Sequence, residues 1–132
     1  MVKKDKILVA GGAGYIGTRL CNTLSKKYNI TVVDNFWFGD FLEKNITKIK
    51  KDIKSLTVHD LKGFKAVLFL GGLSNDPMAL YRPDLNFIEN SATPTYLAFI
   101  AKQAGVKRFI CASSCSVYGY TKRMMEKMFM EH

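Results

Sequence analysis

Short apolar runs that alternate with helix-like segments limit the folds open to this chain more than any other feature. Lys6–Ala10 and Ala66–Leu70 are compact, mostly apolar runs, and glycines directly follow both of them. Between them, Tyr15–Lys26 repeats apolar residues at helical spacing. Buried strands that alternate with helices form parallel sheets, because each helix carries the chain back to the end of the sheet at which the previous strand began. The sequence therefore predicts an α/β protein with a doubly wound sheet.

The same reading gives bounds for the elements. Strands are expected at Lys6–Ala10, Ile30–Asp34, Ile46–Asp52, Ala66–Leu70 and Arg108–Ala112, and helical segments at Tyr15–Lys26, Leu56–Leu61, Leu85–Ala104 and Tyr118–Glu131. Asn35–Asn45 is expected to form a loop or a short helix. The long helix is expected to be broken or kinked near Pro94 and to stop at Gly105. We expect a Rossmann-type sheet of about five parallel strands in the order 3-2-1-4-5.

A glycine-rich turn links the first expected strand to the first expected helix. Gly11 suits the tight turn, Gly14 lets the backbone approach a ligand, and Gly17 permits close packing of helix and strand. The free N–H groups that open the helix, at Tyr15 and Ile16, suit a pyrophosphate. This context favours a dinucleotide-binding turn over an ordinary strand–helix turn, although the spacing is G-x-x-G-x-x-G rather than G-x-G-x-x-G.

Asp34 closes the second expected strand and supports the same interpretation. An acid at this place can accept both hydrogen bonds of an adenosine ribose. Its charge would also repel a 2′-phosphate, so it favours NAD over NADP as the cofactor. The alternative is that Asp34 only forms the turn before Asn35.

Composition restricts the partners and the compartment. The net charge of +9, from 20 Lys+Arg and 11 Asp+Glu, indicates a solvated basic face, with attraction of an anionic ligand or of nucleic acid as alternatives. We expect no nucleic-acid partner, because the chain has no Arg/Lys stripe and no nucleic-acid motif. No apolar run reaches the roughly 18 residues of a membrane span, and no signal peptide is recognisable. Three cysteines without disulfide or metal spacing indicate reduced thiols, so we expect a cytoplasmic protein without a metal.

Six short motifs follow one another along the chain. They are Gly11–Gly17, Val33–Asn35, Lys51–Ile53, Leu70–Gly72, Asn90 and Ala112–Gly119. Together they resemble the extended short-chain dehydrogenases/reductases, and more narrowly the NAD-dependent nucleotide-sugar epimerases and dehydratases. The resemblance covers nearly the whole chain and keeps the family's order.

The resemblance implies how NAD is held. Asp52 and Ile53 would hold the adenine, and Leu70–Gly72 would run under the cofactor, where the family usually has alanines. Asn90 would steady the site from the long helix. The full set of expected cofactor residues is Gly11, Gly14, Tyr15, Ile16, Gly17, Asp34, Asn35, Phe36, Asp52, Ile53, Leu70, Gly71, Gly72, Asn90 and Ser113.

The resemblance also implies a catalytic group of Ser114, Tyr118 and Lys122. In the family, the serine hydroxyl binds the substrate oxygen and the tyrosine acts as general base, helped by the lysine ammonium. Helical spacing i, i+4 puts Tyr118 and Lys122 on one face. In the family, however, the Val-Tyr-Gly and Tyr-x-x-x-Lys segments are separate, whereas here Tyr118 belongs to both.

Three hypotheses for function remain. The leading one is a minimal NAD-dependent enzyme that moves a hydride to and from a carbon of a nucleotide-sugar. The alternatives are a non-catalytic NAD-binding or oligomerisation module and a folded fragment without activity. We expect residues 1–132 to form a single NAD(P)-binding domain without the family's C-terminal substrate domain. The resemblance further implies a homodimer through the long helix and Tyr118–Glu131.

Overall fold

The computed structural model describes residues 4–73 and 76–113. Its strands are β1 (Lys6–Ala10), β2 (Asn29–Asp34), β3 (Thr47–Lys50), β4 (Ala66–Phe69) and β5 (Arg108–Cys111). Its helices are α1 (Tyr15–Leu24), α2 (Asp76–Tyr81), α3 (Pro83–Phe87) and α4 (Thr93–Gln103), with 3-10 turns η1 (Ile53–Ser55) and η2 (His59–Leu61) and the π-helical turn η3 (Ile88–Ala92). All five expected strands are present.

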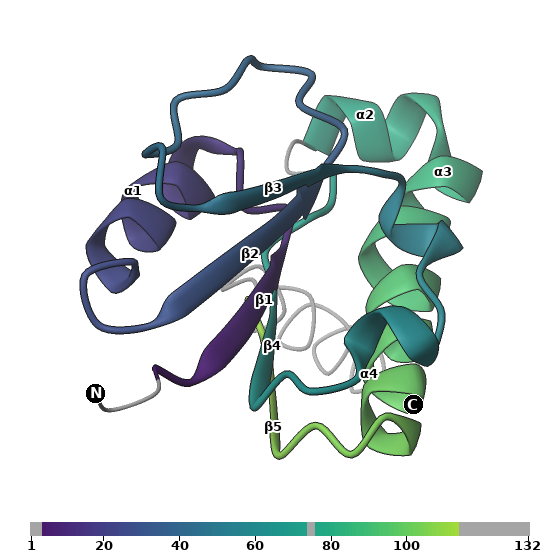
Figure 1. Cartoon of the computed structure of the whole chain (residues 1–132). Helices are drawn as coiled ribbons and strands as arrows, with labels where there is room; N and C mark the ends of the chain where they lie inside the picture. The colour runs from purple at the N-terminus through teal and green to yellow at the C-terminus, as the bar shows by residue number, and fades with distance from the viewer. Residues whose placement is uncertain (1–3, 74–75, 114–132) are drawn as a thin grey trace, which may run out of the picture.

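The five strands form one parallel sheet in the order β3-β2-β1-β4-β5, which confirms the doubly wound Rossmann-type fold (Figure 1). Along β1, Lys6 lies opposite Asn29 of β2, and Ala10 lies opposite both Val33 of β2 and Phe69 of β4. The strand order reverses at β1. In such sheets, ligands bind beyond the carboxyl ends of the strands at this point of reversal.

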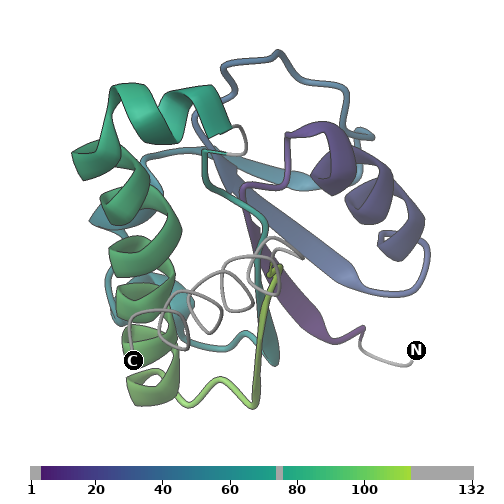
Figure 2. The ribbon, with the colours of Figure 1, turned by 180° about the vertical axis from the view of Figure 1, so that it is seen from behind.

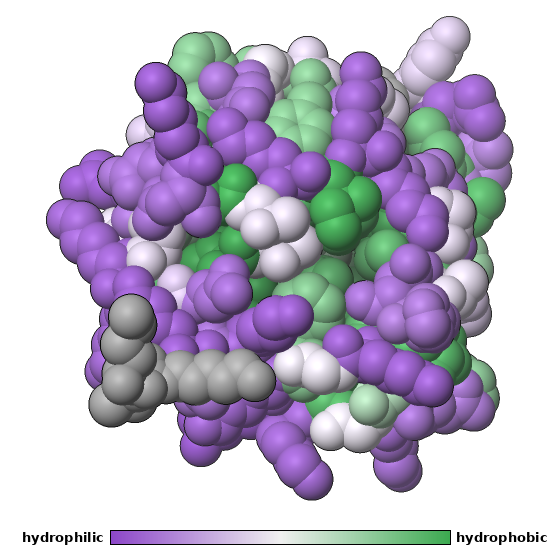
Figure 3. All heavy atoms as spheres, in the orientation of Figure 1, coloured by the Kyte–Doolittle hydropathy of each residue, from purple (hydrophilic) through white to green (hydrophobic). Residues whose placement is uncertain are grey.

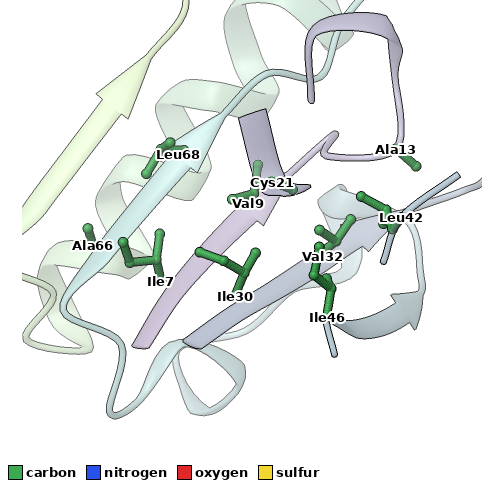
Figure 4. Close-up of a cluster of buried hydrophobic side chains, with 10 residues drawn as sticks. All are labelled: Ile7, Val9, Ala13, Cys21, Ile30, Val32, Leu42, Ile46, Ala66 and Leu68. Atoms are coloured by element: carbon green, nitrogen blue, oxygen red, sulfur yellow. The ribbon is translucent and has the colours of Figure 1, made fainter. Parts of the chain in front are cut away.

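Apolar side chains pack on both faces of the sheet. On one face, Val9 packs in a cluster with Cys21 of α1 (Figure 4). On the other face, Leu8 and Val67 pack in a cluster with Leu97 of α4. Successive strand residues point to opposite faces, so β1 supplies both clusters. Figures 1 and 2 show α1 covering one side of the sheet and α4 with the 3-10 turns covering the other.

The helix expected at Leu85–Ala104 is divided into α3, η3 and α4. Pro94 lies just after the π-helical turn, and proline both lacks an N–H and crowds the preceding turn. The Thr93 hydroxyl donates to the carbonyl of Ile88 at 2.8 Å, which joins residues across the wider turn. The stop at Gly105 is confirmed, since this residue has a φ of +80°.

Two further segments can be compared with the prediction. Asn35–Asn45 is a loop, one of the two predicted alternatives, whereas α2 was not predicted from the sequence. The helix expected at Tyr118–Glu131, and with it half of the expected dimer contact, lies outside the described residues. Hydrophilic side chains cover most of the face seen in Figure 3, around a smaller apolar area.

Candidate functional site

The segments that follow β1, β2 and β4 meet at the carboxyl edge of the sheet. The Gly11 N–H donates to the Val33 carbonyl at 2.9 Å, and the Leu70 N–H donates to the Ala10 carbonyl at 2.8 Å. These bonds carry the strand ladders into the turns and fix the turns relative to one another. Two adjoining hollows open here, which we call the strand-side hollow, of about 190 Å³, and the helix-side hollow, of about 730 Å³.

The hollows bring together most of the expected cofactor residues. The strand-side hollow is lined by Gly11, Gly14, Asp34, Asn35, Asp52, Ile53, Leu70, Gly71 and Gly72 from that set, with Trp37, Phe38, Lys54, Leu73, Leu85 and Glu89. The helix-side hollow is lined by Gly11, Gly14, Tyr15, Ile16, Gly17, Leu70 and Gly72 from that set, with Ala13, Thr18, Phe38 and Phe41. Phe36, Asn90 and Ser113 line neither hollow.

The glycine turn has the geometry that the sequence predicts. Gly11 has a φ of +80°, and a Cβ there would lie 2.5 Å from the Cα of Gly71. At Gly17, a Cβ would lie 2.7 Å from the backbone of Gly12. At Gly14, by contrast, a Cβ would meet only the Gly11 carbonyl oxygen, at 3.8 Å. Gly11 and Gly17 are therefore needed for packing, whereas Gly14 leaves open space beside the hollows.

Helix α1 begins at this turn and can bind an anion. Gly14 is its N-cap, no side chain caps it, and its first turn contains no acidic residue. The first N–H groups of a helix have no partner within the helix and carry partial positive charge. These groups, at Tyr15 to Gly17, lie along the helix-side hollow and suit a pyrophosphate.

Asp34 joins the glycine turn to the loop after β2. Its Oδ2 accepts the Ala13 N–H at 3.0 Å, and its Oδ1 accepts the Phe36 N–H at 2.8 Å. The carboxylate therefore stabilises the turn after β2, as the turn-forming alternative predicts. It also lines the strand-side hollow, as binding of an adenosine ribose requires. Each carboxylate oxygen can accept two hydrogen bonds, so acceptor capacity remains for a ribose.

Asp52, Lys54 and Glu89 form a charged border of the strand-side hollow. Asp52 Oδ1 accepts the Lys54 N–H at 2.9 Å and caps η1. Lys54 Nζ lies 3.5 Å from Asp52 Oδ2 and donates a hydrogen bond to Glu89 of η3. The bond to Glu89 raises the pKa of Lys54 above its usual value. This ion pair links η1 to η3 at the hollow.

Asn90 supports the segment after β4 from outside the hollows. Gly72 has a φ of +137°, and a Cβ there would collide with Asn90 Oδ1. The Asn90 amide also donates to Asn86 Oδ1 at 2.6 Å. The side chain thus steadies the site through the backbone, as the family resemblance implies, without lining either hollow.

Trp37 and Phe38 were not among the expected cofactor residues, whereas their neighbour Phe36 was. The Phe36 ring is half-buried against the core cluster of Figure 4. The next two residues line the strand-side hollow, and their side chains are 74% and 80% exposed. The sequence shows three consecutive aromatic residues at Phe36–Phe38, but it does not show which of them packs on the core and which line the hollow. Lys54 and Glu89 were missed because the sequence does not reveal their pairing.

The expected catalytic residues Ser114, Tyr118 and Lys122 lie outside the described residues. Ser113, the last residue described, is exposed at the end of the segment after β5. Within residues 4–73 and 76–113, no cluster of three His, Cys, Asp or Glu side chains could hold a metal ion. No helix in this part of the chain is long and apolar enough to cross a membrane.

Comparison with known proteins identifies the family. A model of the NAD dependent epimerase/dehydratase family matches residues 7–131. The chain belongs to this family. A UDP-glucose 4-epimerase of Klebsiella pneumoniae is 32% identical over 130 residues, covering 86% of this chain and 92% of that protein. The chain spans only 36% to 41% of the length of other epimerase relatives, such as that of Oryza sativa subsp. japonica at 30% identity.

Solved structures share the fold. The UDP-N-acetylglucosamine 4-epimerase from Methanobrevibacter ruminantium M1, in complex with UDP-N-acetylmuramic acid, matches with a TM-score of 0.81 at 27% identity, covering 89% of this chain and 40% of that one. MoeE5 in complex with UDP-glucose and NAD matches with a TM-score of 0.75 at 31% identity, covering 86% and 38%. These comparisons confirm the resemblance and NAD as the cofactor of the family.

Proposed function

We propose that this chain binds NAD along the two adjoining hollows, with the adenosine half in the strand-side hollow. The geometry of Asp34 carries this proposal. Its carboxylate is held between the N–H groups of Ala13 and Phe36, and its remaining lone pairs can accept the two ribose hydroxyls. The pyrophosphate would then lie over Gly14 and the start of α1.

The charge of Asp34 sets the expected cofactor preference. A 2′-phosphate would bring at least one further negative charge against this carboxylate, so NAD should bind more tightly than NADP. Calorimetry with both cofactors tests this, on wild type and on Asp34→Asn, which is nearly isosteric and uncharged but also loses one of the two backbone hydrogen bonds. We expect wild type to prefer NAD and the variant to bind NAD more weakly with less preference. Equal affinity of wild type for the two cofactors would contradict the assignment.

The reaction we propose is proton and hydride transfer on a nucleotide-sugar. NAD, when bound, supplies the hydride acceptor and donor. Ser114 would bind the reacting hydroxyl of the sugar, and Tyr118 would remove its proton. Lys122, four residues after Tyr118 in the sequence, would favour the ionised phenol. The named relatives are epimerases of UDP-sugars, so we propose UDP-sugars as the substrate class.

Turnover of UDP-sugars tests this chemistry separately from cofactor binding. Purified chain saturated with NAD is incubated with UDP-glucose or UDP-N-acetylglucosamine, and the sugar products are separated. We expect conversion by wild type and a loss of at least about 100-fold in Tyr118→Phe, the size of a general-base contribution. Equal rates in both would exclude Tyr118 as the base.

A non-catalytic NAD-binding or oligomerisation module is the second candidate. The observation that favours it is the merging of two family segments at Tyr118. We also propose a homodimer through α4 and Tyr118–Glu131, and the 59% exposure of Phe99 on α4 supports this surface. NAD binding with a dimer by light scattering, but without turnover of either UDP-sugar, would favour the module. The variant Phe99→Glu should then yield monomers.

A further inference from the structure

The loop after β2 contains a tight turn that holds two aromatic residues at its tip. The Gly39 N–H donates to the Phe36 carbonyl at 3.2 Å, and Trp37 and Phe38 lie between them. Phe36 has a φ of +57° and Gly39 a φ of +94°. A positive φ is ordinary for glycine but costs conformational energy at a bulky residue such as phenylalanine. Such strain persists only where the surroundings hold it, and it is typical of ligand-binding segments.

Two contacts hold this strained residue. The Phe36 ring packs against the apolar core beside α1, and its N–H donates to Asp34 Oδ1 at 2.8 Å. The first residue of the turn is therefore fixed from both its side chain and its backbone. Trp37 directly follows the residue that binds Asp34, and both Trp37 and Asp34 line the strand-side hollow.

The far side of the loop is fixed as well. The Asn22 amide of α1 donates to the Phe41 carbonyl at 3.2 Å and accepts the Glu43 N–H at 3.0 Å. Lys48 of β3 pairs with Asp40 at 2.8 Å. The turn thus stands between two anchored segments, which reduces the conformational entropy that a ligand must remove on binding.

Within this held turn, Trp37 and Phe38 are left largely exposed, at 74% and 80%, yet both line the strand-side hollow. Ile53 and Asp52 line the same hollow. An anchored pair of exposed rings beside a hollow that aliphatic residues such as Ile53 also line suits a flat heteroaromatic ligand, because such ligands stack on aromatic side chains.

We propose that Trp37 and Phe38 form an aromatic wall that stacks on the adenine of the cofactor. This inference rests on the proposed NAD site and adds two binding residues to it. Asp34 would fix the ribose and the aromatic wall would cover the attached base, so adenosine would be held by charge and by stacking from one short segment. The stacking contact should contribute to affinity for any ligand that contains adenosine.

Trp37 is the only tryptophan of the chain, so its fluorescence reports on one ring. Three probes separate the halves of the cofactor: NAD, ADP, and nicotinamide mononucleotide, which lacks adenine. We expect NAD and ADP to quench and saturate the Trp37 emission, with no change from nicotinamide mononucleotide. In calorimetry, Trp37→Ala should weaken NAD and ADP binding by roughly 5- to 100-fold, the range for loss of one stacked base.

Matched variants guard against indirect effects. Trp37→Phe should recover most of the affinity, since it keeps an aromatic ring. Tyr81→Ala removes another exposed aromatic side chain, 80% exposed and outside both hollows, and should bind NAD as wild type does. Because the Trp37 side chain is exposed, Trp37→Ala should keep the melting temperature of wild type.

The possible results separate this inference from the proposed function. If wild type binds NAD but Trp37→Ala and Phe38→Ala bind it equally well, the aromatic wall is excluded while the NAD site stands. The same holds if saturating NAD leaves the Trp37 emission unchanged, and a surface for another protein would then be the better explanation. If wild type binds neither NAD nor ADP, both the inference and the proposed function are overturned.

Discussion

The side-chain amide of Asn90 pairs with both backbone groups of Leu73. Asn90 Oδ1 accepts the Leu73 N–H at 2.9 Å, and Asn90 Nδ2 donates to the Leu73 carbonyl at 2.8 Å. The two bonds connect η3 to the segment after β4, which borders both hollows through Gly72. The segment after β4 has no regular structure at Leu73, and the Asn90 side chain binds both its N–H and its carbonyl, as a neighbouring β-strand would.

Replacing Asn90 by alanine should weaken both the fold and the site. Each lost hydrogen bond contributes about 0.5–1.5 kcal/mol, so Asn90→Ala should lower the free energy of unfolding by about 1–3 kcal/mol in urea titrations. NAD affinity should fall as well, because the Leu73 segment is released. Asn45→Ala is the control, since Asn45 is exposed and has no side-chain hydrogen bond within the described part of the chain. A cost no larger than that of the control would contradict the role of Asn90.

The neighbouring glycines should respond differently to alanine. Gly72→Ala combines a strained φ of +137° with a collision against Asn90, and we expect it to cost about 1–3 kcal/mol. Gly71→Ala meets the flexible end of Ile53 at 2.9 Å, which can rotate away at a cost of about 1 kcal/mol or less. Urea unfolding of the two variants checks the order. The reverse order would show that this backbone rearranges.

The ion pair between Lys54 and Glu89 should affect binding more than stability. Their side chains are 41% and 24% exposed, so breaking the pair should cost less than about 1 kcal/mol of stability. Lys54→Met and Glu89→Gln should each weaken NAD binding a few-fold, because the border of the strand-side hollow loses its link. If the two act as one unit, the double variant binds like either single variant. Fully additive losses would argue against the pair.

Cys21 should make stability depend on alkaline pH. Burial raises the pKa of its thiol from 9.0 to about 11. Between these values the unfolded chain loses the thiol proton while the folded chain keeps it, so stability falls as pH rises. At pH 10 the expected loss from this group is about 1–2 kcal/mol. Urea unfolding at pH 8 and pH 10 should show a steeper loss in wild type than in Cys21→Ala, and equal losses would contradict the assignment.

Features with a local physical cause could be predicted from the sequence. β1 has the predicted bounds, because its apolar run follows Lys6 and ends at Gly11, where a positive φ turns the chain. The stop at Gly105 follows from the same conformational freedom of glycine. The strand order follows from right-handed crossovers between successive parallel strands. The candidate site could be predicted from Gly11–Gly17 and Asp34, because few functions other than dinucleotide binding need these glycines and an acidic residue at these places.

Features set by tertiary contacts could not be predicted. The positive φ of Phe36 depends on the core beneath its ring and on Asp34, and no residue pattern announces it at a phenylalanine. The site residues Lys54 and Glu89 lie far apart in sequence and meet only through the packing of η1 against the long helical segment. The interruption near Pro94 was predicted, but its form, a π-helical turn at Ile88–Ala92, was not, because the residue types do not distinguish a π-helical turn from a kink.

The most direct test of this account is NAD binding by wild type and by Gly14→Val. Gly14 has a φ of −75°, which any residue adopts, and a Cβ there enters open space beside both hollows. The variant should therefore fold with a similar melting temperature. We predict that wild type binds NAD and that Gly14→Val loses at least about 10-fold in affinity, because its side chain takes the place of the pyrophosphate. No binding by wild type, or equal binding by the variant, would contradict the proposed site.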